Sequence, residues 1–125
     1  MTKPPSSTSG ALARQNEPAV LILTSLASGT KHGYALTKDI AAFSGVTLGP
    51  GTLYGAIARL EERGLITPTP SHDRRQPYQI TTSGRAALAE AVQEMRALAN
   101  EGASRLERGD LSASIRPRRV IVGLA

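Results

Sequence analysis

The spacing of apolar residues changes twice along this chain, and the two changes limit the folds that it can adopt. From residue 11 to residue 63 the apolar positions recur at the three- and four-residue intervals of helices. Residues 65–69 and 78–81 then have the composition of strands and enclose a polar segment bounded by prolines. The helical interval returns at residue 82 and continues to about residue 108. This order of elements predicts a mainly α-helical fold with a small β-hairpin.

The first helical segment, residues 11–28, is apolar on nearly every side in its AVLILTSLAS stretch, so we expect a helix buried at the centre of the fold. Pro18 lies early in this segment, and a proline in a helix interior costs about 3 kcal/mol. The helix therefore either begins near Asn16, a good N-cap residue, or consists of two pieces that meet at a kink. Gly29 is expected to end it.

Two further helices are expected on either side of a short connection. Residues 30–44 and residues 52–63 carry the helical patterns, and Pro50 suits the first helical position of the later one. Gly45 and Gly64 are expected to end these helices. The residues at helical spacing are Tyr34, Leu36, Ile40 and Phe43 in the earlier helix, with Tyr34 and Leu36 expected in the core, and Leu53, Ile57 and Leu60 facing inward in the later one.

The last helical segment is longer than so small a domain needs. Capped by Thr82 or Ser83 and continuing to Glu107 or Arg108, it would measure roughly 40 Å at 1.5 Å per residue. Its apolar residues alternate at three- and four-residue spacing, as in a coiled-coil seam. This seam either packs on the first helix of its own chain or, as its length favours, joins two copies of the chain. Its members are Leu88, Val92, Met95, Ala99, Gly102 and Leu106.

Charge and composition favour a nucleic-acid partner and argue against several other classes. Among the 125 residues, 15 Lys and Arg stand against 10 Asp and Glu, which gives a net charge of +5 and suits DNA. The absence of Cys excludes disulfides and thiolate zinc sites. His32 is expected to cap or pack rather than to bind a metal, and we expect no cofactor. The sequence shows no nucleophile–base pair and no phosphate-binding loop, so we do not expect an enzyme. No apolar run approaches the roughly 20 residues of a membrane span.

Two helices joined by a short glycine-containing turn and followed by a β-ribbon are typical of a winged helix-turn-helix. A major groove admits one helix, which here would be residues 52–63, because small and polar residues stand at its start. Arginines at the hairpin tip suit phosphates or a narrow minor groove. The candidate DNA contacts are Thr52, Tyr54 and Arg59 in the third helix, Lys31, Tyr34 and Lys38 in the second, and Arg74 and Arg75 in the hairpin.

Three stretches of the chain, within about residues 18–98, resemble one family. HGYAL in the second helix, LGPGTLYGAIARLEERGLI through the third and DRRQPYQITTSGR across the hairpin are similar to the PadR-like family of bacterial transcriptional regulators. The family's His-Gly-Tyr matches residues 32–34, and its Pro-Gly-Thr-Leu-Tyr matches residues 50–54. The chain departs from the family at Gly55, where proline is common, and at residues 76–77, where further basic and aromatic residues are common.

The resemblance implies a homodimer, held together by one C-terminal helix, that represses transcription from a palindromic operator in double-stranded DNA. Two recognition helices would enter successive major grooves about 34 Å apart. Such regulators work in the bacterial cytoplasm, on the nucleoid when bound to DNA, and some bind small effectors between the C-terminal helices. Met95 is a candidate to line such a pocket, with ordinary core packing as its alternative.

Two other interpretations remain open at this point. One is a MarR-type regulator, against which residues 50–54 argue, and the other is a winged helix that binds only proteins, against which the basic hairpin argues. The expected organisation is a disordered arm over residues 1–10, a DNA-binding domain over 11–81, a dimerisation helix over 82–109 and a basic-apolar tail over 110–125.

Overall fold

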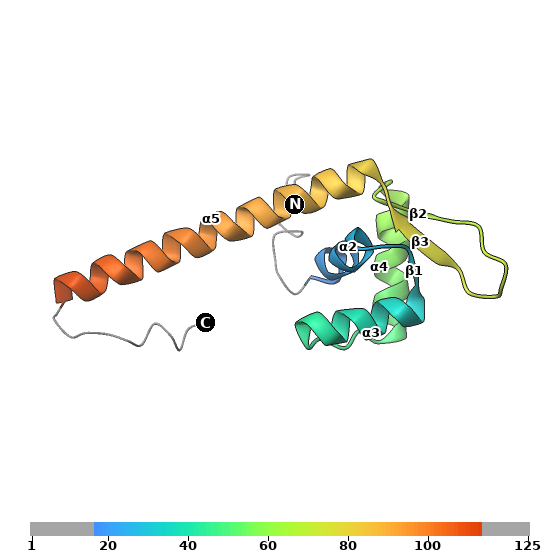
Figure 1. Cartoon of the computed structure of the whole chain (residues 1–125), viewed down its shortest axis with the longest axis horizontal. Coiled ribbons are helices and arrows are strands. Elements are labelled where there is room, and N and C mark those ends of the chain that lie inside the picture. Colours follow the sequence, from blue (N-terminus) through green and yellow to red (C-terminus); the bar gives the residue numbers. More distant parts are fainter. Residues whose placement is uncertain (1–16, 114–125) are drawn as a thin grey trace, which may run out of the picture.

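The computed structural model describes residues 17–113, and it has the mainly helical fold with a small antiparallel sheet that the sequence predicts (Figure 1). The expected arm, residues 11–16 and the tail beyond residue 113 lie outside this range. The elements are α2 (Pro18–Ala27), β1 (Lys31–His32), α3 (Gly33–Ser44), α4 (Pro50–Glu62), β2 (Ile66–Pro68), β3 (Pro77–Ile80) and α5 (Thr82–Ala113). In Figure 1, α2, α3 and α4 gather near one end of α5, and the hairpin of β2 and β3 projects from them.

The helix α2 lies at the centre of this group and contacts α3, α4, α5 and β3, as its apolar sequence predicts. Ile22 and Leu23 are fully buried, and burying each such side chain stabilises the fold by about 1.5–3 kcal/mol. The helix begins at Pro18, with Glu17 as its N-cap residue in extended backbone. Proline is tolerated at this position because its missing N–H would have no partner within the helix.

The first correction concerns residues 30–32, which the sequence analysis assigns to a helix. Lys31 and His32 instead form β1, a third strand that pairs antiparallel with β3, so the sheet has the order β1-β3-β2. Their backbone groups find partners in a strand that is distant along the chain. The helix α3 begins at Gly33 because the His32 Nδ1 accepts the Ala35 N–H at 3.3 Å, so the expected capping role of His32 is confirmed.

The second correction concerns the two aromatic residues of α3. Leu36 and Ile40 are fully buried, but Tyr34 is 65% exposed and Phe43 is 47% exposed, so the prediction that Tyr34 belongs to the core is wrong. The reason is geometric, because a short helix that touches its neighbours through one stripe buries positions four residues apart. Tyr34 lies off that stripe and faces outward. Phe43, seven residues after Leu36, lies along the edge of the stripe in the last turn of α3, where it is only partly covered.

A tight turn joins α3 to α4, and its residues behave as the sequence predicts. Gly45 adopts the left-handed conformation, with φ of 78°, and ends α3. Leu48 is buried in the core and holds the turn against the helices. The helix α4 begins at Pro50 and buries Leu53, Ala56, Ile57 and Leu60, after which Gly64, with φ of 73°, leads into the hairpin.

The helix α5 follows the hairpin with no linker. The N-cap is Thr81 rather than the predicted Thr82 or Ser83, because the Thr81 Oγ1 accepts the Gly84 N–H at 3.0 Å. The Thr81 N–H in turn donates to the Leu65 carbonyl at 3.1 Å, beside β2. The helix continues to Ala113, beyond the predicted end at Glu107 or Arg108. Neither α5 nor any other helix within residues 17–113 is long and apolar enough to cross a membrane.

The first half of α5 packs on α2, which is one of the two alternatives that the sequence analysis leaves open. Ala91 is buried in the core, and around it lie three partly buried side chains: Ala87, Leu88 and Met95. The two alanines are core residues that the predicted seam misses, because the stripe that faces α2 is rotated from the seam towards them.

We predict that Gly84→Ala lowers the free energy of unfolding by about 1–3 kcal/mol, because a Cβ at this position would overlap the Leu65 carbonyl oxygen and crowd Ile80. Urea denaturation at one protein concentration measures the change. Gly51→Ala is the control, in the exposed first turn of α4, where a Cβ has no atom within 4 Å and the higher helix propensity of alanine raises stability by up to about 1 kcal/mol. Equal effects of the two substitutions would contradict a close contact between α5 and the hairpin.

Candidate nucleic-acid interface

The exposed face of α4 has small residues along its middle and larger polar side chains on its two flanks. Gly51, Gly55 and Ala58 follow one another along the middle at helical spacing. No acidic residue stands in the first turn, so no side chain there neutralises the partial positive charge of this helix end. This surface lets another molecule approach the helix backbone closely.

Thr52 and Arg59 lie on one flank of this face, since they are seven positions apart, and both are exposed. A Cβ added to Gly55 would lie 3.7 Å from an Arg59 Nη atom, so the arginine folds back along the helix towards its N-terminus. The glycine that departs from the family pattern lies under this guanidinium group, and α4 continues through it without a break.

Tyr54 lies on the opposite flank, where its ring is half exposed. Its hydroxyl group lies directly over Gly33 at the start of α3, so closely that a Cβ on Gly33 would overlap it. The contact explains why a glycine precedes Tyr34, and the sequence analysis missed it because nothing in the spacing relates residue 33 to residue 54. Tyr54 therefore braces α4 against α3 and still presents part of its ring outward.

The outer face of α3 holds a second pair of predicted contacts. The Lys38 Nζ lies 5.5 Å from the centroid of the Tyr34 ring, a cation–π arrangement between residues one helical turn apart. Tyr34 is more exposed than Tyr54, the tyrosine on α4. The pair places a positive charge and a phenol hydroxyl group on the same outward surface.

Lys31 is the predicted contact that the structure places elsewhere. Its Nζ donates to the Ser25 carbonyl at 2.6 Å and to the Ser28 hydroxyl at 3.0 Å, at the C-terminal end of α2. It also lies 3.9 Å from the Asp39 carboxylate, which accepts a hydrogen bond of 2.5 Å from the buried Ser25 hydroxyl. A cation at the C-terminus of a helix stabilises the unpaired carbonyl groups there, so Lys31 acts as a cap for α2.

The hairpin tip, residues 69–77, is organised by its own hydrogen bonds. The Gln76 side-chain amide donates to the carbonyl groups of Thr69, at 2.9 Å, and Pro77, at 2.7 Å. The Asp73 carboxylate accepts the Arg75 backbone N–H at 2.9 Å and the Ser71 hydroxyl at 3.1 Å. These two hydrogen bonds lower the pKa of Asp73, in that order of size, so its carboxylate stays charged.

Arg74 and Arg75 are both exposed at this tip, as predicted, but they have different neighbours. An Arg75 Nη atom lies 3.5 Å from the His32 Nε2, which links the tip to the start of α3. Beside this link, Tyr78 is half-buried, and burial, followed by the nearby Glu61 carboxylate and Tyr54, raises the pKa of its phenol. The Tyr78 ring therefore stays neutral where the strand meets α4.

The second half of α5 projects beyond the other helices (Figure 1). It carries uncovered apolar side chains. Leu98 is 74% exposed and Leu106 is 59% exposed, and Ala99 and Gly102 between them are also exposed. By contrast, Leu88, Val92 and Met95 are partly buried in the first half. The predicted seam is thus divided, with its first half packed on its own chain and its second half open.

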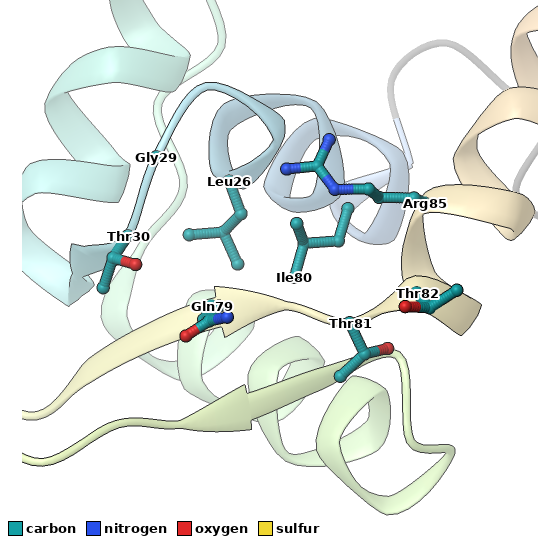
Figure 2. Close-up of a pocket in the computed structure, with 8 residues that line it drawn as sticks. All are labelled: Leu26, Gly29, Thr30, Gln79, Ile80, Thr81, Thr82 and Arg85. Carbon is teal, nitrogen blue, oxygen red and sulfur yellow. The ribbon is translucent and has the colours of Figure 1, made fainter.

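A groove of about 540 Å³ lies between the end of α2, β3 and the start of α5. Figure 2 shows Arg85 reaching from α5 towards α2, above Leu26 and Ile80. The Arg85 guanidinium group lies 3.5 Å from the Ala27 carbonyl oxygen. Met95, the residue considered for an effector pocket, does not line this groove and instead packs against the core.

The sequence matches the model of the "Transcriptional regulator PadR-like family" over residues 22–90. It is 37% identical over 86 residues to the Mycobacterium tuberculosis transcriptional regulator Rv3488, an alignment that covers 64% of this chain and 77% of that protein. It is also 43% identical over 82 residues to an uncharacterized 37.1 kDa protein in a Streptomyces fradiae transposon. That alignment covers 66% of this chain and only 24% of the transposon protein.

Solved structures give the same result. A PadR family transcription regulator from Clostridium difficile has a TM-score of 0.64 at 29% identity, with 71% of this chain and 97% of that chain covered. A PadR family transcriptional regulator from Eggerthella lenta has a TM-score of 0.63 at 30% identity, with 82% and 91% covered. These similar proteins are regulators and not enzymes.

We predict that Lys31→Met lowers the free energy of unfolding by about 1–2 kcal/mol, because it removes the charged donor to the Ser25 carbonyl and the cation that lies between the end of α2 and the Asp39 carboxylate. Lys38→Met is the control, since Lys38 lies on the exposed face of α3 and its loss should change stability by no more than about 0.5 kcal/mol. Thermal or urea unfolding of both variants gives the comparison. If Lys31→Met is as stable as Lys38→Met, the capping role is wrong.

Proposed function

Because the chain belongs to the PadR-like family of transcriptional regulators, we propose that it binds double-stranded DNA as a homodimer and represses transcription from a palindromic operator. The proposed organisation is a DNA-binding domain over residues 11–81 followed by a dimerisation helix over 82–109. The family match argues against the MarR-type alternative. Like other such regulators, the protein is proposed to work in the bacterial cytoplasm, on the nucleoid when bound.

The observation that carries the proposal is the exposed face of α4 together with the cations around it. The middle of that face is small enough to enter a groove, and Arg59 extends along it towards the uncompensated N-terminus. Lys38 on α3 and the two arginines of the hairpin tip supply charge for phosphates on either side. Helix, turn, helix and wing are the parts that a winged helix uses to bind DNA.

The helix and the wing are proposed to have different tasks. Thr52 and Arg59 suit base edges in the major groove, and the exposed part of the Tyr54 ring suits a thymine methyl group. Tyr34, Lys38, Arg74 and Arg75 suit the phosphate backbone, which positions the protein without reading sequence. Lys31 is the least favourable of the predicted contacts, since its ammonium group already binds the end of α2.

The dimer is proposed to form through the uncovered half of α5. Leu98, Ala99 and Leu106 face solvent in a single chain, and a stripe of this kind on a projecting helix suits a partner helix. Two copies joined there would hold two copies of α4 at a fixed separation, which a palindromic site requires. A small effector that changes the angle between the two DNA-binding parts would then release the operator.

We predict that Tyr54→Ala lowers affinity for the operator more than affinity for random DNA, by a difference of about 1–3 kcal/mol. The double variant Arg74→Ala with Arg75→Ala should weaken binding to both duplexes alike. It should also flatten the slope of log K against log salt by about one unit per lost phosphate contact. Fluorescence titrations of each variant with operator and random duplexes at several salt concentrations test both statements.

The same titrations separate DNA binding from the remaining alternative, a winged helix that binds only proteins. A wild-type protein that binds neither duplex at low salt would favour that alternative. Equal losses on the two duplexes for Tyr54→Ala would make Tyr54 a positioning contact. An unchanged salt slope for the double arginine variant would remove the wing from the interface.

We predict that Leu106→Glu converts a dimer into a folded monomer, because Leu106 is exposed in the single chain and a charge there affects only the proposed partner contact. Ala97→Glu is the control on the opposite side of α5, where the same charge remains in solvent. Sedimentation equilibrium at micromolar concentration measures the mass of each variant. A monomeric wild type would contradict the proposed architecture.

A further inference from the structure

We propose that His32 and Arg75 together bind one DNA phosphate, so that the hairpin tip and the start of α3 hold the same point of the backbone. The proposal rests on the DNA binding proposed above and adds a residue, His32, that the sequence analysis assigns only to capping. It starts from an imbalance of hydrogen-bond donors and acceptors between these two side chains.

The imidazole ring of His32 has donors facing both of its nitrogens. The Ala35 N–H points at Nδ1, at 3.3 Å, and the Arg75 guanidinium group lies 3.5 Å from Nε2. A neutral imidazole has only one nitrogen that accepts, and a guanidinium group has donors only. Because Nδ1 accepts in order to cap α3, Nε2 carries the proton. The Nε2–H and the Arg75 N–H groups therefore meet with no acceptor between them.

The part of the chain that the structure describes does not supply that acceptor. Asp73 is a carboxylate close enough to interact with this pair, since the charges of Arg75 and His32 add to the hydrogen bonds that lower its pKa. Its Oδ1 atom, however, accepts the Arg75 backbone N–H and the Ser71 hydroxyl within the tip, and within the described residues its Oδ2 atom forms no hydrogen bond with the Arg75 guanidinium group or with His32. Between residues 17 and 113, Arg75 forms no ion pair with a carboxylate. An oxygen from another molecule is needed to satisfy both donors.

A phosphate oxygen fits this position better than other acceptors. It is anionic, so it pairs with the guanidinium group through a charge-assisted hydrogen bond and accepts a second hydrogen bond from the Nε2–H. The pair is exposed at the edge of the surface formed by α3, α4 and the wing, beside Tyr34 and the contact between Tyr54 and Gly33. One phosphate held there would fix the wing relative to α3, and through Tyr54 relative to α4.

The first arm of the test uses the free protein. At pH 8, where an ordinary imidazole is neutral, the ¹⁵N chemical shifts of the His32 ring should show the proton on Nε2. The chain has two histidines, so a His72→Gln variant assigns the signals. A proton on Nδ1 would let Nε2 accept from Arg75, which would satisfy the pair and overturn the proposal without any measurement on DNA.

The second arm measures DNA affinity with variants that keep the fold. His32→Asn retains a side-chain oxygen that can cap α3 but loses the ring N–H, so its thermal unfolding should match that of the wild type. We expect it to weaken binding to operator and random duplexes alike, by roughly three- to tenfold. Combined with Arg75→Ala, the loss should be smaller than the product of the two single losses. Combined with Arg74→Ala, the control, the losses should multiply.

The third arm replaces single phosphates of the operator duplex by neutral methylphosphonates. Replacement at one position in each half-site should weaken binding by the wild type and leave binding by His32→Asn or Arg75→Ala unchanged. If His32→Asn binds as the wild type does, or if its effect multiplies with that of Arg75→Ala, the shared phosphate is wrong and DNA binding itself stands. If the wild type binds no DNA, both proposals fail.

Discussion

The burial of α2 determines where the other helices and the central strand lie, because α3, α4, β3 and α5 all pack against this one helix. A ten-residue helix that is apolar on nearly every side must be enclosed to be stable. The carbonyl groups at its C-terminal end need hydrogen-bond donors, and Lys31 supplies one from the strand that leads into α3. The orientation of the exposed helices is therefore a consequence of how α2 is covered and capped.

The periodicity of apolar residues predicted the helices, because each helix is long enough to show a regular spacing in its own sequence. Leu53, Ile57 and Leu60 recur at helical spacing and are buried as predicted. The strand β1 could not be predicted in this way, because two residues carry no period. Its existence depends on β3 lying alongside it, 45 residues later in the pairing of His32 with Pro77. Tyr34 was misplaced because an aromatic residue at helical spacing does not reveal how wide the buried stripe is.

The candidate surface was predicted in its location but not in the tasks of its side chains. Sequence indicates that Lys31, His32 and Gln76 are polar. It cannot indicate that their partners are the end of α2, the N-terminus of α3 and the carbonyl groups on the two sides of the hairpin tip. Those partners are set by tertiary contacts between distant segments. Glycines gave the clearest hidden signal, since Gly33 and Gly84 stand where another element leaves no space for a side chain.

Because α5 follows the hairpin without a linker, a rotation of α5 moves the whole winged helix with it. With Thr81 serving as both the end of the hairpin and the cap of the helix, no flexible residues absorb a rotation. At 1.5 Å per residue, Thr82 lies about 30 Å along the axis from Gly102, in the uncovered half. If α5 tilts by about 6° about its uncovered half, the winged helix at its other end moves by about 3 Å. Successive bases along a strand are about 3.4 Å apart, so in the proposed DNA complex this displacement would take α4 out of register with its site.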